Sequence, residues 1–218
     1  MLYGHDKSGN WMNRRFLYLC GLIAPVLFVF TTILGGAIRP GYSHVSDTVS
    51  ELFSPGSPNR LLLSALHTLF TVLLVLFGIG ILKFVQRNES SKRIGLFGAS
   101  AFIAMGALNI LTATIFPQDA WGSPSTFFGE MHIIVSGVIS ILSIMYILLI
   151  GNWFHRTGIS LNFRTYSIAT VVAVVLAAAW FIASFGSQIM GLSERLTILV
   201  GFQWTFILAL LILNHDYI

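Results

Sequence analysis

The chain alternates between long apolar runs and short polar connections. Apolar runs of about 20 residues recur, and each is long enough to cross the roughly 30 Å hydrocarbon core of a bilayer as an α-helix. Their positions predict six membrane-spanning helices near residues 16–38, 61–82, 94–116, 131–150, 166–186 and 195–214. Because all connections but the first are short, consecutive helices are expected to pack antiparallel. The pattern predicts an all-α integral membrane bundle that forms a single domain over residues 1–218.

The first connection, residues 39–60, has a helical pattern of its own. Its apolar residues share one side of a helix, with the spacing i, i+4, i+7 and i+8: Val45, Val49, Leu52 and Phe53. Its polar residues share the other side: Asp47, Ser50, Glu51 and Ser54. The spacing predicts about two turns of amphipathic helix over residues 46–53, flat on the outer membrane surface. Ser46 can cap its start, and Thr48 with Glu51 matches a capping box as an alternative start.

Composition supports the membrane assignment and argues against two classes of partner and cofactor, namely nucleic acids and thiolate-bound metal clusters. Hydrophobic residues make up 56% of the chain and charged residues only 9%, with a mean hydropathy of +0.83. Soluble domains carry about a quarter charged residues. The net charge of +4 comes from basic residues spread between the spans, so no nucleic-acid partner is expected. Because Cys20 is the only cysteine, the chain holds no internal disulfide and no thiolate metal cluster.

The distribution of Lys and Arg predicts the orientation. With a cytoplasmic N-terminus, nine basic residues lie on the inner side: Lys7, Arg14, Arg15, Lys83, Arg87, Lys92, Arg93, Arg156 and Arg164. Three lie on the outer side: Arg39, Arg60 and Arg195. The positive-inside rule therefore predicts a multi-pass protein of the cell membrane with both termini cytoplasmic. Loops 39–60, 117–130 and 187–194 then face outward and hold most of the acids, namely Asp47, Glu51, Asp119, Glu130 and Glu194.

Ionisable residues inside membrane spans are costly and suggest function. His67 lies inside the second span, whereas His132 lies near the start of the fourth, beside Glu130. His67, His132 and Asp119 are candidate zinc ligands that leave one position open for water, an arrangement suited to hydrolysing a lipid ester or amide. No HExxH motif or comparable spacing supports this site, so no cofactor is expected and zinc stays an alternative.

Three short stretches identify a resemblance to a known family. "YSHVSDTVSELFSPGSP" precedes the second span, "FPQD" closes the third and "GEMH" opens the fourth. Together they resemble an uncharacterised prokaryotic six-helix membrane family, catalogued as domain of unknown function 998. The family pattern falls on Ser46, Ser50, Glu51, Gly56, Pro58, Pro117, Asp119 and His132. The resemblance implies a six-helix bundle and brings no established activity, and His67 is not tied to its pattern.

These observations favour a non-enzymatic bundle that binds a lipid of the outer leaflet, or a partner, at an outward-facing polar pocket. The candidate binding residues are Ser46, Ser50, Glu51, Arg60, His67, Asp119, Glu130 and His132. Glu51, Asp119 and His132 are expected to converge in that pocket. One alternative is a membrane-embedded hydrolase, with candidate catalytic residues His132, Asp119, Glu51 and Asp47. A second alternative is a small-solute transporter.

Overall fold

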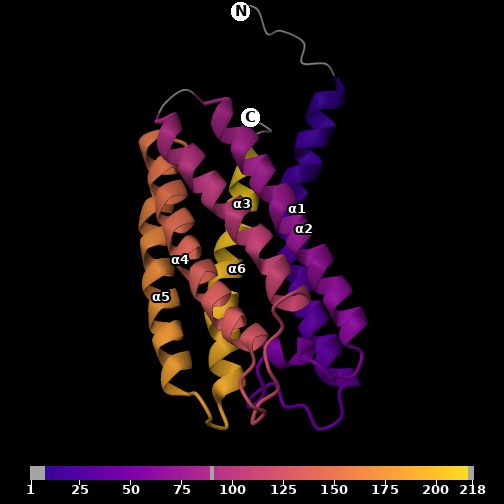
Figure 1. Cartoon of the computed structure of the whole chain (residues 1–218). Helices are drawn as coiled ribbons and strands as arrows, with labels where there is room; N and C mark the ends of the chain where they lie inside the picture. The colour runs from indigo at the N-terminus through magenta and orange to yellow at the C-terminus, as the bar shows by residue number, and fades with distance from the viewer. Residues whose placement is uncertain (1–7, 89–90, 216–218) are drawn as a thin grey trace, which may run out of the picture.

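The computed structural model describes residues 8–88 and 91–215 and consists of helices (Figure 1). The long helices are α1 (Ser8–Ile38), α2 (Arg60–Gln86), α3 (Lys92–Thr114), α4 (Phe127–Arg156), α5 (Phe163–Ala183) and α6 (Met190–His215). A single 3₁₀ turn, η1 (Ser50–Phe53), lies between α1 and α2. All six long helices are apolar enough to cross a membrane, and the described residues form no strand. The predicted all-α class with six spanning helices is confirmed.

The helices lie where the apolar runs predict them, but most extend further. α4 covers Phe127–Arg156 instead of 131–150, and α6 begins at Met190 instead of 195. Hydropathy marks only the part of a helix that matches the hydrocarbon core, whereas polar residues continue the helix into the interface. At the start of α4, for example, the Thr126 hydroxyl accepts a hydrogen bond from the backbone N–H of Gly129.

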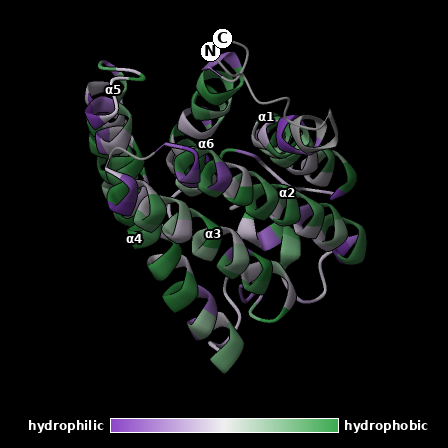
Figure 2. Ribbon diagram, turned by 90° about the horizontal axis from the view of Figure 1, so that it is seen from above, coloured by the Kyte–Doolittle hydropathy of each residue, from purple (hydrophilic) through white to green (hydrophobic). Residues whose placement is uncertain are grey.

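The six helices form a closed ring in chain order, because α6 packs against both α5 and α1 (Figures 1 and 2). Aromatic side chains fill the interior of this ring. Phe28, Phe70 and Phe202 come from α1, α2 and α6, and their ring centroids lie 4.8–5.2 Å apart. Further along, Tyr146 of α4 contacts Trp204 of α6, with ring centroids 5.5 Å apart. Figure 2 shows apolar residues on the outer faces of the helices as well, as expected for surfaces that meet lipid.

The two ends of the bundle differ in charge. α1 begins and α6 ends at the same end of the bundle (Figure 1). We call this the basic end, because it holds Lys83, Arg87, Lys92, Arg93, Arg156 and Arg164. We call the opposite end the loop end. It holds the long loop, defined as residues 39–59, and the two shorter connections 115–126 and 184–189. The orientation of these ends in the membrane stays a prediction, with the basic end cytoplasmic.

Candidate functional site

The predicted helix over residues 46–53 is wrong in its extent, since only Ser50–Phe53 is helical and as a 3₁₀ turn. The cause is a tertiary contact with the start of α6. The carbonyls of Val45 and Ser46 accept hydrogen bonds from the N–H groups of Leu192 and Gly191, at 2.9 and 3.2 Å. These carbonyls are therefore not available for i→i+4 bonds within the loop. As a result, the Val45 side chain is 47% exposed rather than turned inward.

The 3₁₀ turn is tucked into the bundle, not laid flat on the surface. Val49, Leu52 and Phe53 are buried as predicted, and the turn packs against α1 and α2. Glu51 and Ser54, which were predicted on the polar side, are buried too. The pattern located three of the four apolar residues correctly, but two of the four residues predicted on the polar side are buried as well.

The capping box predicted at Thr48 and Glu51 is present. The Thr48 N–H donates to the Glu51 carboxylate at 3.0 Å, and the Glu51 N–H donates to the Thr48 hydroxyl at 3.2 Å. Glu51 thus stabilises its own turn. The loop after this turn is fastened to the same residue, since Ser57 and Arg39 each donate to the Glu51 carbonyl at 2.7 Å. Gly56 allows the return, with a φ of +81° that favours glycine.

Asp47 and Ser46 also stabilise the loop locally. The Asp47 carboxylate accepts hydrogen bonds from the Ser43 N–H at 2.9 Å and from the Ser46 hydroxyl at 3.1 Å. Ser46 therefore does not act as the cap of a helix.

Two adjacent residues of α6 anchor the long loop, and the sequence reasoning did not include them among the site residues. The buried Glu194 carboxylate accepts hydrogen bonds from the Val49 N–H and, at 3.0 Å, from the Ser50 hydroxyl. The Arg195 guanidinium donates to the carbonyls of His44 and Asp47 at 2.7 and 2.8 Å. α6 thus binds the loop through an acidic and a basic side chain, across about 145 residues of sequence.

Two further features show how closely the long loop approaches α6. A Cβ atom on Gly191 would lie 2.1 Å from the Asp47 carbonyl oxygen, so only glycine fits there. The Tyr42 hydroxyl accepts a hydrogen bond from Arg195, and burial raises the pKa of Tyr42 although the nearby guanidinium opposes that shift. A sequence signal for this contact existed, because Glu194 and Arg195 are adjacent charges at the start of an apolar run.

The two predicted histidines both bind the C-terminal end of α3. His132 of α4 lies with Nδ1 2.8 Å from the Phe116 carbonyl and 3.3 Å from the Thr112 carbonyl. His67 of α2 lies with Nε2 3.3 Å from the Asn109 carbonyl. The Thr112 carbonyl is among the last of α3, which lack partners within the helix, so His132 satisfies it and ties α3 to α4. His67 ties α3 to α2 through the Asn109 carbonyl, which also accepts a hydrogen bond from the Thr112 hydroxyl at 2.8 Å. The Nδ1 atom of His67 is buried and has no hydrogen-bond partner among the described residues.

Asp119 and Glu130 stabilise the start of α4. The Asp119 carboxylate accepts hydrogen bonds from the backbone N–H and the hydroxyl of Thr126, both at 2.8 Å. Glu130 accepts a hydrogen bond from the Ser125 hydroxyl at 3.2 Å and is exposed. Both acids therefore lie near the N-terminal end of a helix, where the helix dipole favours negative charge.

The predicted site residues thus form two groups. Ser46, Ser50 and Glu51 lie in the long loop, whereas His67, His132, Asp119 and Glu130 lie around the end of α3 and the start of α4. The Phe53 ring links them, since its centroid lies 5.0 Å from that of His67. Convergence of Glu51, Asp119 and His132 in one pocket stays a prediction. Within residues 8–88 and 91–215, no three His, Cys, Asp or Glu side chains are grouped to hold a metal ion.

Arg60 differs from the other predicted site residues. It begins α2, and the preceding Asn59, with a φ of 57°, makes no side-chain cap to the helix. Within the described part of the chain, the Arg60 guanidinium has no hydrogen-bonded or ionic partner. Arg60 is therefore a cation that the fold itself does not use.

Comparison with known proteins gives one match. A family model described as "Protein of unknown function (DUF998)" matches residues 22–211, which is most of the chain and all or part of each of the six spans. The chain belongs to this family. No curated protein and no solved structure was found to match it. The DUF998 match agrees with the resemblance carried by the long loop, and it supports a multi-pass membrane protein without supplying an activity.

Proposed function

We propose that this DUF998 protein is a non-enzymatic membrane bundle that binds the headgroup of an anionic lipid at its loop end, through Arg60. One observation carries the proposal. The carboxylates of Glu51 and Asp119 and the Nδ1 atom of His132 already bind groups of the chain, whereas Arg60 has no partner among the described residues. Arg60 is the cation among the predicted site residues, and its guanidinium is available for an anionic ligand.

The position of Arg60 suits an anionic ligand. It lies in the first turn of α2, where the helix dipole disfavours a positive charge and favours a bound anion. Arginine also binds phosphate with two parallel hydrogen bonds. The next residue, Leu61, is 87% exposed and offers an apolar surface beside the charge. A lipid supplies both matching parts, a phosphate and an acyl chain.

A membrane-embedded hydrolase is the second candidate, and one observation favours it. The Nδ1 atom of His67 has no hydrogen-bond partner among the described residues, so it is available to bind a metal ion or to accept a proton. A hydrolase also needs a free nucleophile or activated water and a second acid–base group. The Ser50 hydroxyl donates to Glu194, and the Asp119 carboxylate is bound to Thr126. A transporter needs a path through the ring, and the aromatic filling of its interior favours the binding proposal instead.

Lipid retention by purified protein tests the proposal. Wild type, Arg60→Gln and Arg60→Lys are exchanged into mixed micelles of phosphatidylglycerol and phosphatidylcholine, and the bound lipid is quantified by mass spectrometry. We expect Arg60→Gln to weaken phosphatidylglycerol retention about tenfold, because a charge-assisted hydrogen bond contributes about 1.5–3 kcal/mol. Arg60→Lys keeps the charge and should retain part of the binding. Arg93→Gln removes an exposed first-turn arginine at the basic end and serves as the matched control.

Two results decide between the candidates. If Arg60→Gln retains the anionic lipid as the wild type does, headgroup binding at Arg60 is wrong. Elemental analysis of the same preparations tests the hydrolase. One equivalent of zinc in the wild type that is lost in His132→Ala would favour the hydrolase over the binding protein.

A further inference from the structure

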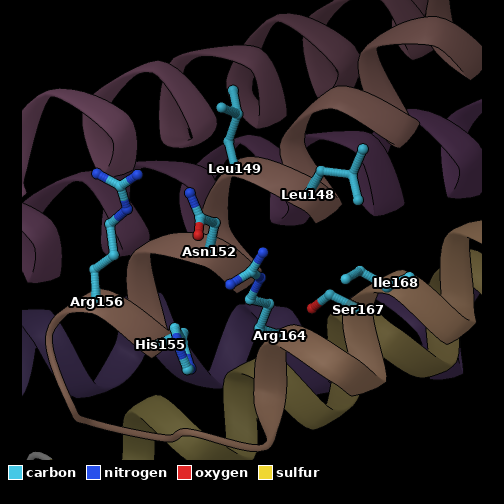
Figure 3. Close-up of a pocket in the computed structure, with 8 residues that line it drawn as sticks. All are labelled: Leu148, Leu149, Asn152, His155, Arg156, Arg164, Ser167 and Ile168. Atoms are coloured by element: carbon cyan, nitrogen blue, oxygen red, sulfur yellow. The ribbon is translucent and has the colours of Figure 1, made fainter.

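A second polar site lies at the basic end, far along the chain from the long loop. A cavity of about 390 Å³ opens between the end of α4 and the start of α5 (Figure 3). Its volume lies within the range of small-ligand sites. Its lining combines apolar residues (Leu148, Leu149 and Ile168) with polar and basic ones (Asn152, His155, Arg156, Arg164 and Ser167).

The charge of this cavity is entirely positive. Arg156 lies in the last turn of α4 and Arg164 in the first turn of α5, and the residues that line the cavity include no acid. Within the described residues, neither guanidinium has a carboxylate partner. Arg156 is well placed at a helix C-terminus, whereas Arg164 lies where the helix dipole disfavours a cation. A bound anion offsets this cost and the repulsion between the two arginines.

The walls of the cavity are fixed by close helix packing. A Cβ atom on Gly151 of α4 would lie 2.4 Å from the Ser167 hydroxyl of α5, so the two helices approach closely below the cavity. The Ser167 hydroxyl donates to the Phe163 carbonyl at 2.7 Å and accepts from the Trp204 indole at 2.9 Å. The His155 ring lies 3.2 Å from the Leu161 carbonyl. The floor and one wall are therefore held in place, and the exposed arginines form the adjustable part.

The apolar part of the lining lies on the surface of two candidate membrane spans. Leu148 and Ile168 are 39% and 45% exposed, on α4 and α5, which are apolar enough to cross a membrane. The arginines lie at the ends of these helices, where a spanning helix is expected to reach the lipid headgroups. A ligand that enters from the bilayer can thus keep its acyl chains beside the leucine and isoleucine while its headgroup reaches the guanidinium groups.

We infer that this cavity binds the phosphate group of an anionic phospholipid in the leaflet at the basic end. Basic pockets between membrane helices bind such headgroups, and arginine matches the geometry of phosphate. The positive-inside rule explains an excess of basic residues at this end. It does not explain why two of them border one cavity without an acid. This inference does not rest on the Arg60 proposal, because it concerns other residues at the opposite end of the bundle.

The test compares two double variants that remove the same charge from the same end. Arg156→Gln/Arg164→Gln changes the cavity, and Lys92→Gln/Arg93→Gln removes two cations from the first turn of α3, outside the cavity lining. Each protein is placed in nanodiscs that contain equal phosphatidylglycerol and phosphatidylcholine. Lipids that co-purify with the protein after transfer to detergent are counted by native mass spectrometry. A thermal unfolding curve for each variant confirms that it is folded.

The wild type and the Lys92→Gln/Arg93→Gln control should retain phosphatidylglycerol over phosphatidylcholine, and Arg156→Gln/Arg164→Gln should reduce that preference about tenfold. Equal loss in both double variants would overturn the inference, because it would mean that general charge attracts the lipid. Absence of any preference in the wild type would overturn it too. If Arg156→Gln/Arg164→Gln keeps the preference for phosphatidylglycerol and Arg60→Gln abolishes it, the lipid binds at the loop end and the inference about the cavity is wrong.

Soluble phosphates share the headgroup chemistry, so a further arm identifies the source of the phosphate. Inorganic phosphate and glycerol 3-phosphate are added at millimolar concentration to the lipid-loaded protein. We expect neither to displace phosphatidylglycerol, because they make no contact with Leu148 and Ile168. Displacement by glycerol 3-phosphate that depends on Arg164 would overturn the assignment to a lipid and identify a soluble phosphate ester as the ligand.

Discussion

The loop end and the basic end both carry arginines, but the fold uses them differently. At the loop end, Arg195 donates to backbone carbonyls of the long loop, and Arg39 donates to the Glu51 carbonyl. At the basic end, Arg156 and Arg164 border an open cavity that no acid lines. The comparison shows that some arginines at the ends of the bundle are used by the fold, whereas others border a cavity and remain available for the proposed ligand. The hydrogen-bond partners of each residue distinguish the two roles, whereas charge alone does not.

Arg60 sharpens this contrast, because it lies at the loop end and yet resembles the arginines of the basic end. Arg60 and Arg164 each lie in the first turn of a helix whose start has no side-chain cap. Both are cations at positions that the helix dipole disfavours. Their similarity suggests one anionic headgroup site at each end of the bundle, one for each leaflet.

The largest expected effect is a difference in thiol labelling between the two ends of the bundle, which shows the side of the membrane on which each end lies. In sealed cells, a membrane-impermeant thiol reagent should label Ser123→Cys and Ser57→Cys at the loop end. It should not label Asn162→Cys at the basic end, which is exposed in the structure. Ser90→Cys is also expected to stay unlabelled, because residue 90 lies in the same predicted inner connection as Arg87 and Lys92, although it falls outside the described residues. Labelling of Asn162→Cys without labelling of Ser123→Cys would reverse the orientation.

Gly191→Ala should release the long loop from α6. The added methyl would lie 2.1 Å from the Asp47 carbonyl oxygen, so the loop must shift and lose its bonds to Gly191, Leu192 and Arg195. We expect the free energy of unfolding to fall by about 2–4 kcal/mol, measured by thermal unfolding in detergent. Gly201→Ala is the control on the same helix, because a Cβ atom there meets nothing within 4 Å. Equal stability of the two variants would mean that the loop does not depend on this contact.

Glu194→Gln should have a smaller effect of the same kind. The amide keeps one acceptor oxygen, so either the Val49 N–H or the Ser50 hydroxyl loses its partner in a buried place. We expect a loss of about 1–3 kcal/mol in the same unfolding measurement. The exposed Glu130→Gln variant should change stability by less than about 0.5 kcal/mol. A neutral Glu194→Gln would contradict an anchoring role for this carboxylate.

The smallest expected effect is the pH dependence of stability that His44 contributes. Partial burial of its imidazole, followed by the positive charge of Arg195, lowers the pKa of His44 below its ordinary value of 6.5. Because the folded-state pKa is the lower one, the unfolded chain binds the proton more readily. The contribution of His44 is therefore complete above pH 6.5 and decreases as the pH falls through the folded-state pKa. The melting temperature should fall slightly more between pH 8 and pH 5 in the wild type than in His44→Gln, and an identical fall in both would contradict this.

The bundle was predictable from the sequence because membrane spans depend on a local property. Each apolar run must satisfy its own backbone hydrogen bonds, and a helix is the way to do so within one segment. The Thr48–Glu51 capping box was also predictable, since its two residues are three positions apart. The length of the loop helix was not, because its carbonyls bind the N–H groups of Gly191 and Leu192.

The sites were harder to predict because they depend on how distant segments pack. Asp119 and His132 have the residue types of a catalytic or metal site, but in the fold they bind the start of α4 and the end of α3. Arg156 and Arg164 contributed to the sequence argument only as indicators of orientation. Their shared cavity depends on the close approach of Gly151 and Ser167, which no spacing in the sequence reveals.

The most direct test of the difference between the two ends is a thermal unfolding measurement in detergent, with and without phosphatidylglycerol. It compares two variants, Glu194→Gln and Arg156→Gln/Arg164→Gln, by the rise in melting temperature that the lipid causes. A lipid that binds the folded state raises that temperature. The account predicts that Glu194→Gln melts at a lower temperature without lipid but keeps most of the lipid-induced rise. It predicts that Arg156→Gln/Arg164→Gln melts like the wild type without lipid and loses most of the rise. The opposite pattern, with the lipid response lost in Glu194→Gln and kept in the arginine variant, would contradict it.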